Sequence, residues 1–108
     1  MKPFLEISHL SDIIEHSSKQ NVIIFKYSNS CGSSERLRQE LKSLLEKNEL
    51  PPVYLITVQI QKALSKQIEE YFDLKHESPQ ILVIKSGKLV ESGDHGRINT
   101  GDLLKFKV

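Results

Sequence analysis

The segment VIIFKYSNSCGSSER, residues 22–36, decides the fold. Its first half, Val22 to Tyr27, is an apolar run of β-branched and aromatic residues, which predicts a strand buried on both faces. A short polar turn follows, and Cys31, the only cysteine, stands where a helical pattern begins. A sulfur at a helix N-terminus lies near the positive end of the helix dipole and near unpaired backbone N–H groups, which favour the thiolate. The segment therefore predicts a reactive thiol at the end of a central strand.

The ionisation of Cys31 decides how reactive this thiol is. A cysteine with the ordinary pKa of ~8.5 is only ~3% thiolate at pH 7. We expect the pKa of Cys31 to lie below 7, a shift for which the helix dipole alone is too weak. Further donors are therefore required, from the N–H or hydroxyl groups of Ser33 and Ser34 or from Arg36, whereas the charge of Glu35 opposes the shift.

Hydrophobic periodicity predicts the remaining elements. Helical spacing predicts helices through residues 10–14 and 37–45, and apolar runs predict strands at 53–58 and 81–84. A turn at 86–88 leads to a fourth strand from Leu89. A further helix buries a stripe made of Leu64, Ile68, Tyr71 and Phe72, and a last short helix starts at Asn99 or Thr100 and buries Leu103 and Leu104.

This order of elements predicts an α/β fold. A strand, a helix and a second strand imply a right-handed parallel crossover, and the final hairpin adds an antiparallel edge. We expect a mixed four-stranded sheet flanked by helices on both faces, formed by one domain over residues 1–108. The Cys31 turn then lies at the carboxyl end of a core strand, where α/β folds collect ligands.

Composition narrows the function. The chain has 108 residues, 38% of them hydrophobic and 27% charged, and a formal net charge of +1. This balance argues against a nucleic-acid partner, and no apolar run reaches the ~18 residues that span a membrane. The N-terminal residues do not resemble a signal peptide, and one free cysteine suits a reducing compartment, so we expect a cytoplasmic protein without a membrane partner. No metal site is expected, because no histidine shares metal-ligand spacing with Cys31; the four are His9, His16, His76 and His95.

Pro79 directly precedes the third strand. One interpretation is a strand-initiating proline with an ordinary trans bond. The context favours another, because a β–α turn with an N-terminal thiol and an x-Pro before a hairpin is the arrangement of the thioredoxin fold. In that fold the proline, here cis-Pro79, packs opposite the cysteine turn, and the backbone of the preceding residue, Ser78, is free to pair with an extended client chain.

The sequence resembles the monothiol bacilliredoxins (YtxJ-like proteins) of the thioredoxin superfamily over nearly its whole length. The residues that carry the resemblance form four groups: Phe25-Lys26-x-Ser28-x-x-Cys31-x-x-Ser34, His76-Glu77-Ser78-Pro79-Gln80, Lys85-x-Gly87-Lys88-x-Val90 and His95-Gly96-x-Ile98. One position differs, because that family commonly has proline directly after the cysteine and this chain has Gly32.

The resemblance implies thiol–disulfide exchange with a single sulfur. Cys31 would take bacillithiol, a low-molecular-weight thiol that serves as co-substrate without any bound cofactor, from bacillithiolated client proteins. Ser34 stands where dithiol relatives have a second cysteine, and its hydroxyl cannot resolve the mixed disulfide. Phe25 stands where dithiol thioredoxins place a buried carboxylate, so a proton acceptor for a resolving thiol is absent as well.

The resemblance also suggests roles for the residues around Cys31. Ser34 either polarises the thiolate or is merely a first-turn helix residue. Lys26 either binds the acidic thiol or is a surface lysine whose stem lies along its strand. The residues assigned to substrate binding are Ser78, Pro79, Lys26, Gly32 and Ser33.

Two other functions stay open at this point. Cys31-Gly32-Ser33-Ser34 and Ser78-Pro79-Gln80 also resemble the motifs of monothiol glutaredoxins, which carry a [2Fe–2S] cluster between two chains. Against that resemblance, phenylalanine is missing at the third position and the glutathione-binding segment survives only as Ser92-Gly93-Asp94-His95. A thioredoxin-fold adaptor that captures partners without turnover is the second alternative.

Overall fold

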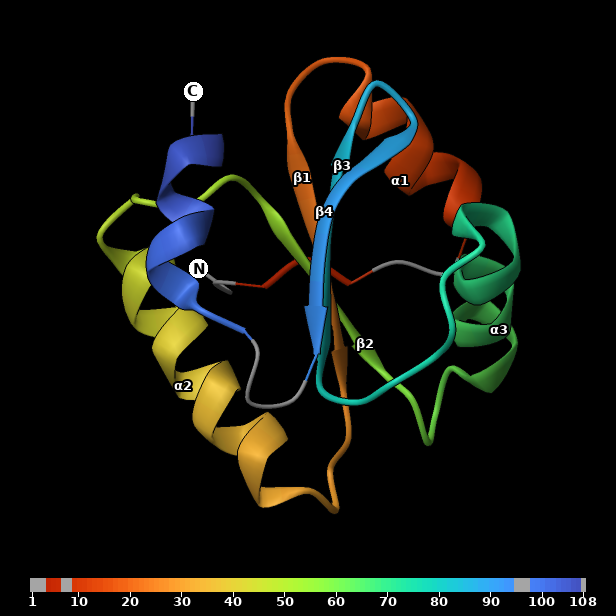
Figure 1. The fold of residues 1–108 in the computed structure, drawn as a ribbon, viewed down its shortest axis with the longest axis horizontal. Helices are drawn as coiled ribbons and strands as arrows, with labels where there is room; N and C mark the ends of the chain where they lie inside the picture. Colours follow the sequence, from red (N-terminus) through yellow and green to blue (C-terminus); the bar gives the residue numbers. More distant parts are fainter. Residues whose placement is uncertain (1–3, 7–8, 95–97, 108) are drawn as a thin grey trace.

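The computed structural model describes residues 4–6, 9–94 and 98–107. A mixed four-stranded sheet with the order β2-β1-β3-β4 forms its centre (Figure 1). β1 pairs in parallel with β2 and antiparallel with β3, and β3 pairs antiparallel with β4. The strands are β1 (Val22–Tyr27), β2 (Val53–Thr57), β3 (Gln80–Lys85) and β4 (Lys88–Asp94). The predicted α/β fold class and the mixed sheet are therefore confirmed.

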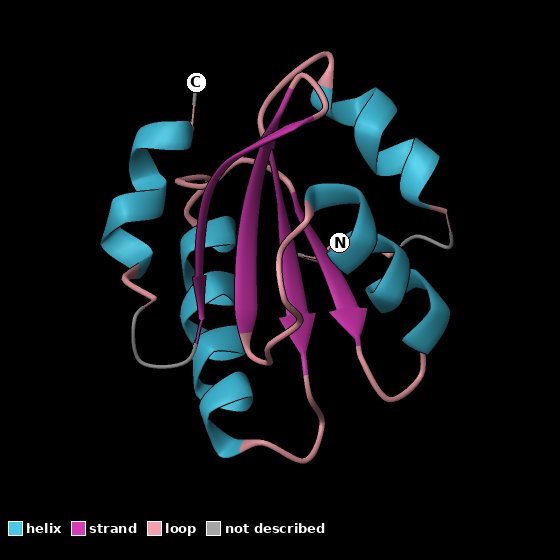
Figure 2. Ribbon diagram, turned by 45° about the vertical axis from the view of Figure 1, so that its right-hand side comes forward, coloured by secondary structure: helices cyan, strands magenta, loops and turns pink. Residues whose placement is uncertain are grey.

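Helices cover both faces of this sheet, as Figures 1 and 2 show. One face carries α2 (Gly32–Glu46) and η2 (Thr100–Phe106), and the other carries α1 (Leu10–Ser17) and α3 (Lys62–Phe72). No helix in the described ranges is long and apolar enough to cross a membrane.

β1 supplies side chains to both halves of the core. Successive strand residues point to opposite faces, so Ile23 and Phe25 pack toward α2, whereas Val22 and Ile24 pack toward α1 and α3. The side chains of residues 22–26 are all buried. This agrees with the prediction of a central strand that is covered on both faces.

The last helix differs from the sequence prediction. η2 begins at Thr100 as expected, but it is a 3₁₀-helix, and only Leu103 of the two predicted leucines is buried. Leu103 is 4% exposed, whereas Leu104 is 40% exposed, so the predicted burial of Leu104 is wrong. A 3₁₀-helix has three residues per turn, so its inward face continues from Leu103 to Phe106 and leaves Leu104 on the outer side.

The stripe of α3 is also narrower than predicted. Tyr71 is 55% exposed, and the buried face consists of Leu64 and Ile68, with Phe72 partly buried behind them. These three residues follow one another at intervals of four, whereas Tyr71 lies at the margin of that face. The ring of Tyr71 instead contacts the ring of Phe72 at 4.8 Å between centroids.

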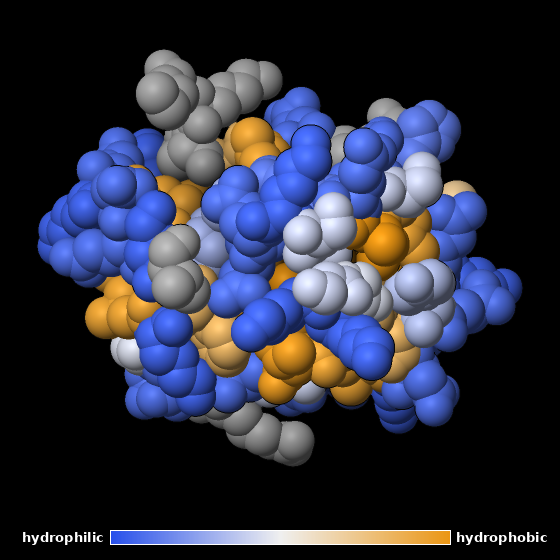
Figure 3. Space-filling view, turned by 90° about the horizontal axis from the view of Figure 1, so that it is seen from above, coloured by the Kyte–Doolittle hydropathy of each residue, from blue (hydrophilic) through white to orange (hydrophobic). Residues whose placement is uncertain are grey.

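Strand register decides which loops share an end of the sheet. Lys26 pairs with Gln80, so the start of β3 and the end of β1 lie at the same edge, and Cys31 follows there. The Ser86–Gly87 turn joins β3 to β4 at the opposite end, where Lys85 pairs with Lys88. Figure 3 views the molecule from that opposite end, which shows hydrophilic side chains and several separate hydrophobic areas.

The two leucines of η2 offer a matched test of this packing. We expect Leu103→Ala to lower the free energy of unfolding by roughly 2–4 kcal/mol, because it leaves a cavity between η2 and the sheet. Leu104→Ala removes a side chain that is largely in water and should cost less than about 1 kcal/mol. Urea unfolding measures both values, and equal losses would contradict the 3₁₀ arrangement.

Candidate functional site

Cys31 is the N-cap residue of α2, directly before the first helical residue. Its side chain is partly exposed, and its sulfur is free. The Ser33 hydroxyl lies 3.0 Å from Sγ and can donate to the thiolate. The backbone N–H groups of Ser33 and Ser34 also favour the thiolate. The Cys31 side chain does not form a standard N-cap hydrogen bond.

These neighbours lower the pKa of Cys31 to about 7. The hydroxyl of Ser33 is the largest cause, the backbone N–H of Ser34 is the second, and the Ser34 hydroxyl makes a smaller contribution. The direction is the expected one, although a pKa of about 7 lies at the upper limit of the predicted range and leaves about half of the thiol ionised at pH 7. Arg36 is not among the groups that cause the shift.

The two polar neighbours of the first turn that the sequence singled out have different surroundings. The Ser34 side chain is fully buried, and its Oγ accepts a hydrogen bond from the N–H of Ser28 at 3.3 Å. Ser34 therefore closes the turn as well as helping the thiolate. The carboxylate of Glu35 accepts hydrogen bonds from Tyr27 at 2.8 Å and from Gln39 at 3.0 Å, and Glu35 is not among the groups that shift the pKa of Cys31.

Gln59, in the turn that follows β2, is a part of this site that was not predicted. Its Nε2 donates to the hydroxyls of Ser28 at 2.7 Å and Ser30 at 3.2 Å, and its Oε1 accepts from the N–H of Asn29 at 3.2 Å. The side chain of Gln59 thus holds the whole turn that precedes Cys31. The signal in the sequence was positional, because Gln59 follows a strand parallel to β1 and so lies at the same carboxyl edge.

Gly32 opens α2 without a conformational requirement for glycine. A Cβ at this position would meet no atom within 4 Å, and its backbone does not adopt a positive φ. The space that a side chain at position 32 would occupy is therefore open.

Phe25 confirms that the floor beneath the turn is apolar. Its side chain is fully buried, and its ring packs against the rings of Phe4 and Tyr27 at 6.2 and 5.9 Å between centroids. No carboxylate occupies this position, so the proton acceptor of a dithiol mechanism is missing there.

The peptide bond between Ser78 and Pro79 is cis. Because Gln80 pairs with Lys26, this bond lies at the edge of the sheet from which the Cys31 turn departs. Pro79 is buried and Ser78 is partly exposed. Within the described ranges, the backbone of Ser78 has no hydrogen-bond partner.

The structure excludes one of the two interpretations of Lys26. Its side chain is fully buried, so it is not a surface lysine. Its Nζ donates to the carbonyl oxygen of Ser65 at 3.0 Å and to Nδ1 of His76 at 3.3 Å. Burial lowers the pKa of Lys26 to about 8, and the carboxylate of Glu69 opposes this shift.

His76 contacts both Lys26 and α3. Its Nδ1 lies 3.3 Å from Nζ of Lys26, and its backbone N–H donates to Oε2 of Glu69 in α3 at 2.7 Å. Burial, and after it the charge of Lys26, lowers the pKa of the His76 imidazole. Gln80 pairs with Lys26 in the sheet and is 2% exposed. Its Nε2 donates a hydrogen bond to the carbonyl oxygen of Lys75. Its Oε1 has no hydrogen-bond partner among the described residues. Through these contacts of His76 and Gln80, the segment before β3 packs on the α3 side of the sheet.

Residues 2–103 match the profile of the family described as monothiol bacilliredoxin BrxC. The chain belongs to this family. The bacilliredoxin is also similar to a solved candidate oxidoreductase with a thioredoxin fold, with 26% identity and a TM-score of 0.81 over 96% of this chain and 93% of the other.

Two thioredoxins show the same fold at lower identity. The N21Q mutant thioredoxin from Halobacterium salinarum is 18% identical, with a TM-score of 0.71 over 95% of this chain and 86% of the other. Mitochondrial thioredoxin 3 from Saccharomyces cerevisiae is 16% identical, with a TM-score of 0.72 over 96% and 93%. The bacilliredoxin is thus a thioredoxin-fold oxidoreductase.

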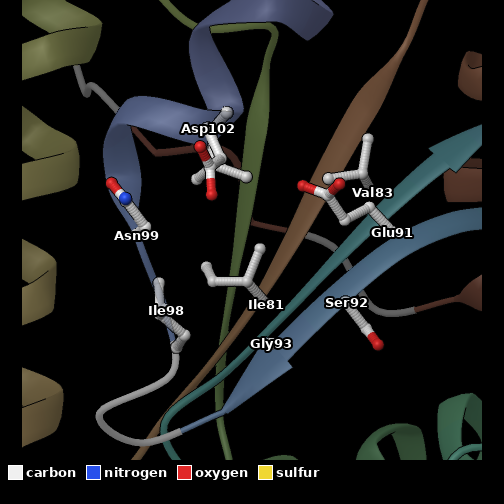
Figure 4. A pocket seen from close by; sticks show the side chains of 9 residues that line it. Ile81, Val83, Glu91, Ser92, Gly93, Ile98, Asn99 and Asp102 are labelled. Carbon is white, nitrogen blue, oxygen red and sulfur yellow. The ribbon is translucent and has the colours of Figure 1, made fainter.

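The closing motif of the family includes His95 and Gly96, which lie outside the described residues. No group of three or more histidine, cysteine, aspartate or glutamate side chains within residues 4–6, 9–94 and 98–107 could hold a metal ion. A cavity of about 250 Å³ lies between η2 and the β3–β4 edge, where Ile81, Ile98 and Asp102 are among the residues that line it (Figure 4).

The Ser33 hydroxyl can be tested by titration of the thiol. We expect Ser33→Ala to raise the pKa of Cys31 from about 7 toward the ordinary ~8.5, because its largest source of stabilisation is lost. At pH 7 the thiolate fraction, and with it the rate of alkylation by iodoacetamide, should fall several-fold. Ser43→Ala, on the exposed side of α2, is the control and should titrate as the unmodified protein does; an unchanged midpoint in Ser33→Ala would contradict the assignment.

Lys26 should make stability depend on pH in alkaline solution. Its pKa is about 8 in the folded chain and about 10.5 when unfolded, so between these values the unfolded chain binds more protons and the free energy of unfolding rises with pH. Relative to Lys26→Met, the unmodified protein should gain at most about 3 kcal/mol over this range. Urea unfolding from pH 7.5 to 10.5 measures the difference, with Lys85→Met as the exposed control. A flat difference would show that Lys26 keeps its ordinary pKa.

Proposed function

We propose that this bacilliredoxin removes bacillithiol from protein mixed disulfides through Cys31. The observation that carries the proposal is the single sulfur at the N-cap of α2, with a pKa of about 7 and with Ser34 where a resolving cysteine would stand. A thiolate is available at neutral pH, and the chain contains no second thiol that could compete for it.

The first step is an exchange between sulfurs. The Cys31 thiolate attacks the bacillithiol sulfur of the client's mixed disulfide. A bond forms between these two sulfurs, while the bond between bacillithiol and the client breaks. The client sulfur leaves as a thiolate and takes a proton from water. The client is thereby reduced, and the disulfide now joins Cys31 to bacillithiol.

The second step requires a partner from solution. The hydroxyl of Ser34 is not a nucleophile for a disulfide, so a second low-molecular-weight thiol must attack the bacillithiol sulfur. The new bond joins the two small thiols, and Cys31 leaves as the thiolate that began the cycle. The low pKa of Cys31 assists this step as well, because a more acidic thiol is a better leaving group.

Recognition of the client is assigned to Ser78 and Pro79. Ser78 is partly exposed, and its backbone has no hydrogen-bond partner within the described part of the chain. An extended client segment could add its own N–H and C=O groups there, as strands do at an open edge. Such pairing would hold the mixed disulfide of the client close to the Cys31 turn.

The proposal predicts catalytic turnover that depends on Cys31. With a bacillithiolated client in excess and free bacillithiol as the second thiol, each molecule should release many equivalents of bacillithiol. Cys31→Ala should lower the rate by on the order of 100-fold or more, to the uncatalysed background. Mass spectrometry of the client follows the release.

Ser43→Ala is again the matched control and should turn over at the unmodified rate. Release of one equivalent followed by arrest, with bacillithiol retained on Cys31, would identify a capturing adaptor and overturn the proposal. An undiminished rate in Cys31→Ala would do the same.

A further inference from the structure

A groove of about 430 Å³ lies beside α3, next to the Cys31 turn. It is bounded by the first turns of α3, by the end of β2 and by the segment before β3. Gln59 joins the two sites, because it lines the groove and also donates hydrogen bonds to Ser28 and Ser30. The residues that line the groove are Val58, Gln59, Lys62, Ser65, Lys66, Glu69 and His76.

Two lysines at its rim give the groove positive charge. Lys62 and Lys66 lie one helical turn apart, so they are neighbours on one face of α3, and both are exposed. Neither has an ion-pair partner within the described ranges. They also lie in the first turns of an 11-residue helix, at the positive end of its dipole.

Most of the exposed surface of the groove is apolar, and the charged groups along its inner wall partly neutralise one another. The ammonium of Lys26 lies behind Ser65 and His76, to which it is hydrogen-bonded. Glu69 and Glu77 are the negative charges that act on His76. Glu69 holds the backbone N–H of His76 at 2.7 Å, and Glu77 also has an interaction of its own, so the lysines at the rim are the charges that remain for a ligand.

We propose that this groove binds the carboxylate-bearing part of the acidic low-molecular-weight thiol whose sulfur is joined to Cys31. Its volume is in the range of small-molecule sites. Lys62 and Lys66 supply charges complementary to carboxylates, and Gln59 brings the groove to the Cys31 turn. The assignment rests on the proposed function, and it moves recognition of the acidic thiol from the buried Lys26 to two lysines that a ligand can reach.

Binding without redox chemistry tests this site separately from turnover. A Cys31→Ser protein is titrated with the S-methyl ether of bacillithiol, and backbone N–H shifts are followed by NMR. Shifts should gather at residues 59, 62, 65, 66 and 76. Charge reversal by Lys62→Glu and Lys66→Glu together should weaken binding about 10-fold or more, and 0.5 M salt should weaken binding to the unreversed protein.

Lys85→Glu with Lys88→Glu is the matched control. It makes the same change of net charge on exposed lysines at the opposite end of the sheet, and it should leave the affinity unchanged. Glutamate has a helix propensity close to that of lysine and is favoured near a helix N-terminus, so the α3 variant should fold normally. Equal weakening by both pairs would show a general charge effect and overturn the site.

A kinetic arm uses two small disulfides that differ in charge. The α3 charge reversal should slow the attack of Cys31 on 3,3′-dithiodipropionate, which is anionic, and leave its attack on neutral 2-hydroxyethyl disulfide unchanged. Absence of NMR shifts in the groove, or shifts caused by an acidic client peptide but not by the thioether, would overturn the proposal. Failure of turnover with intact thioether binding would instead count against the proposed function alone.

Discussion

Pairing of β1 on both of its edges is the constraint on which the site depends. Because β2 lies on one side and β3 on the other, β1 is enclosed by strands as well as by the two helical layers. The turn to Cys31 begins at the carboxyl end of this buried strand. The register between Lys26 and Gln80 then brings the Ser78–Pro79 bond to that same edge. Because β2 is parallel to β1, Gln59 after β2 lies at this edge too. The turn after β1, the turn after β2 and the segment before β3 therefore all lie at the edge where Cys31 is found.

Much of this arrangement was predictable from local pattern. The apolar run of β1, the helical stripe after Cys31 and the hairpin at Gly87 each have a strong periodicity or turn signal, and all three agree with the structure. The position of Cys31 at the start of a helix was predictable for the same reason. The predictions that failed, for Leu104 and Tyr71, concern residues at the margin of an apolar face, where a change of helix type or of a fraction of a turn reverses exposure.

Lys26 and Gln59 could not be understood from their own neighbourhoods in the sequence. The burial of Lys26 depends on acceptors 39 and 50 residues away, and a pattern within β1 contains no information about them. The hydrogen bonds of Gln59 to Ser28 and Ser30 likewise join residues about 30 positions apart. The size of the pKa shift of Cys31 could not be predicted from the sequence either. It depends on the rotamer of Ser33 and not only on the helix dipole.

The single sulfur changes what oxidation of this molecule means. A chain with one cysteine has no dithiol–disulfide couple and therefore no two-electron midpoint potential of its own. Every disulfide form is a compound with another molecule, whose sulfur determines its free energy as much as Cys31 does. The oxidised fraction is then the fraction of Cys31 that carries another molecule's sulfur. It rises and falls with the concentrations of thiols and disulfides in the surroundings.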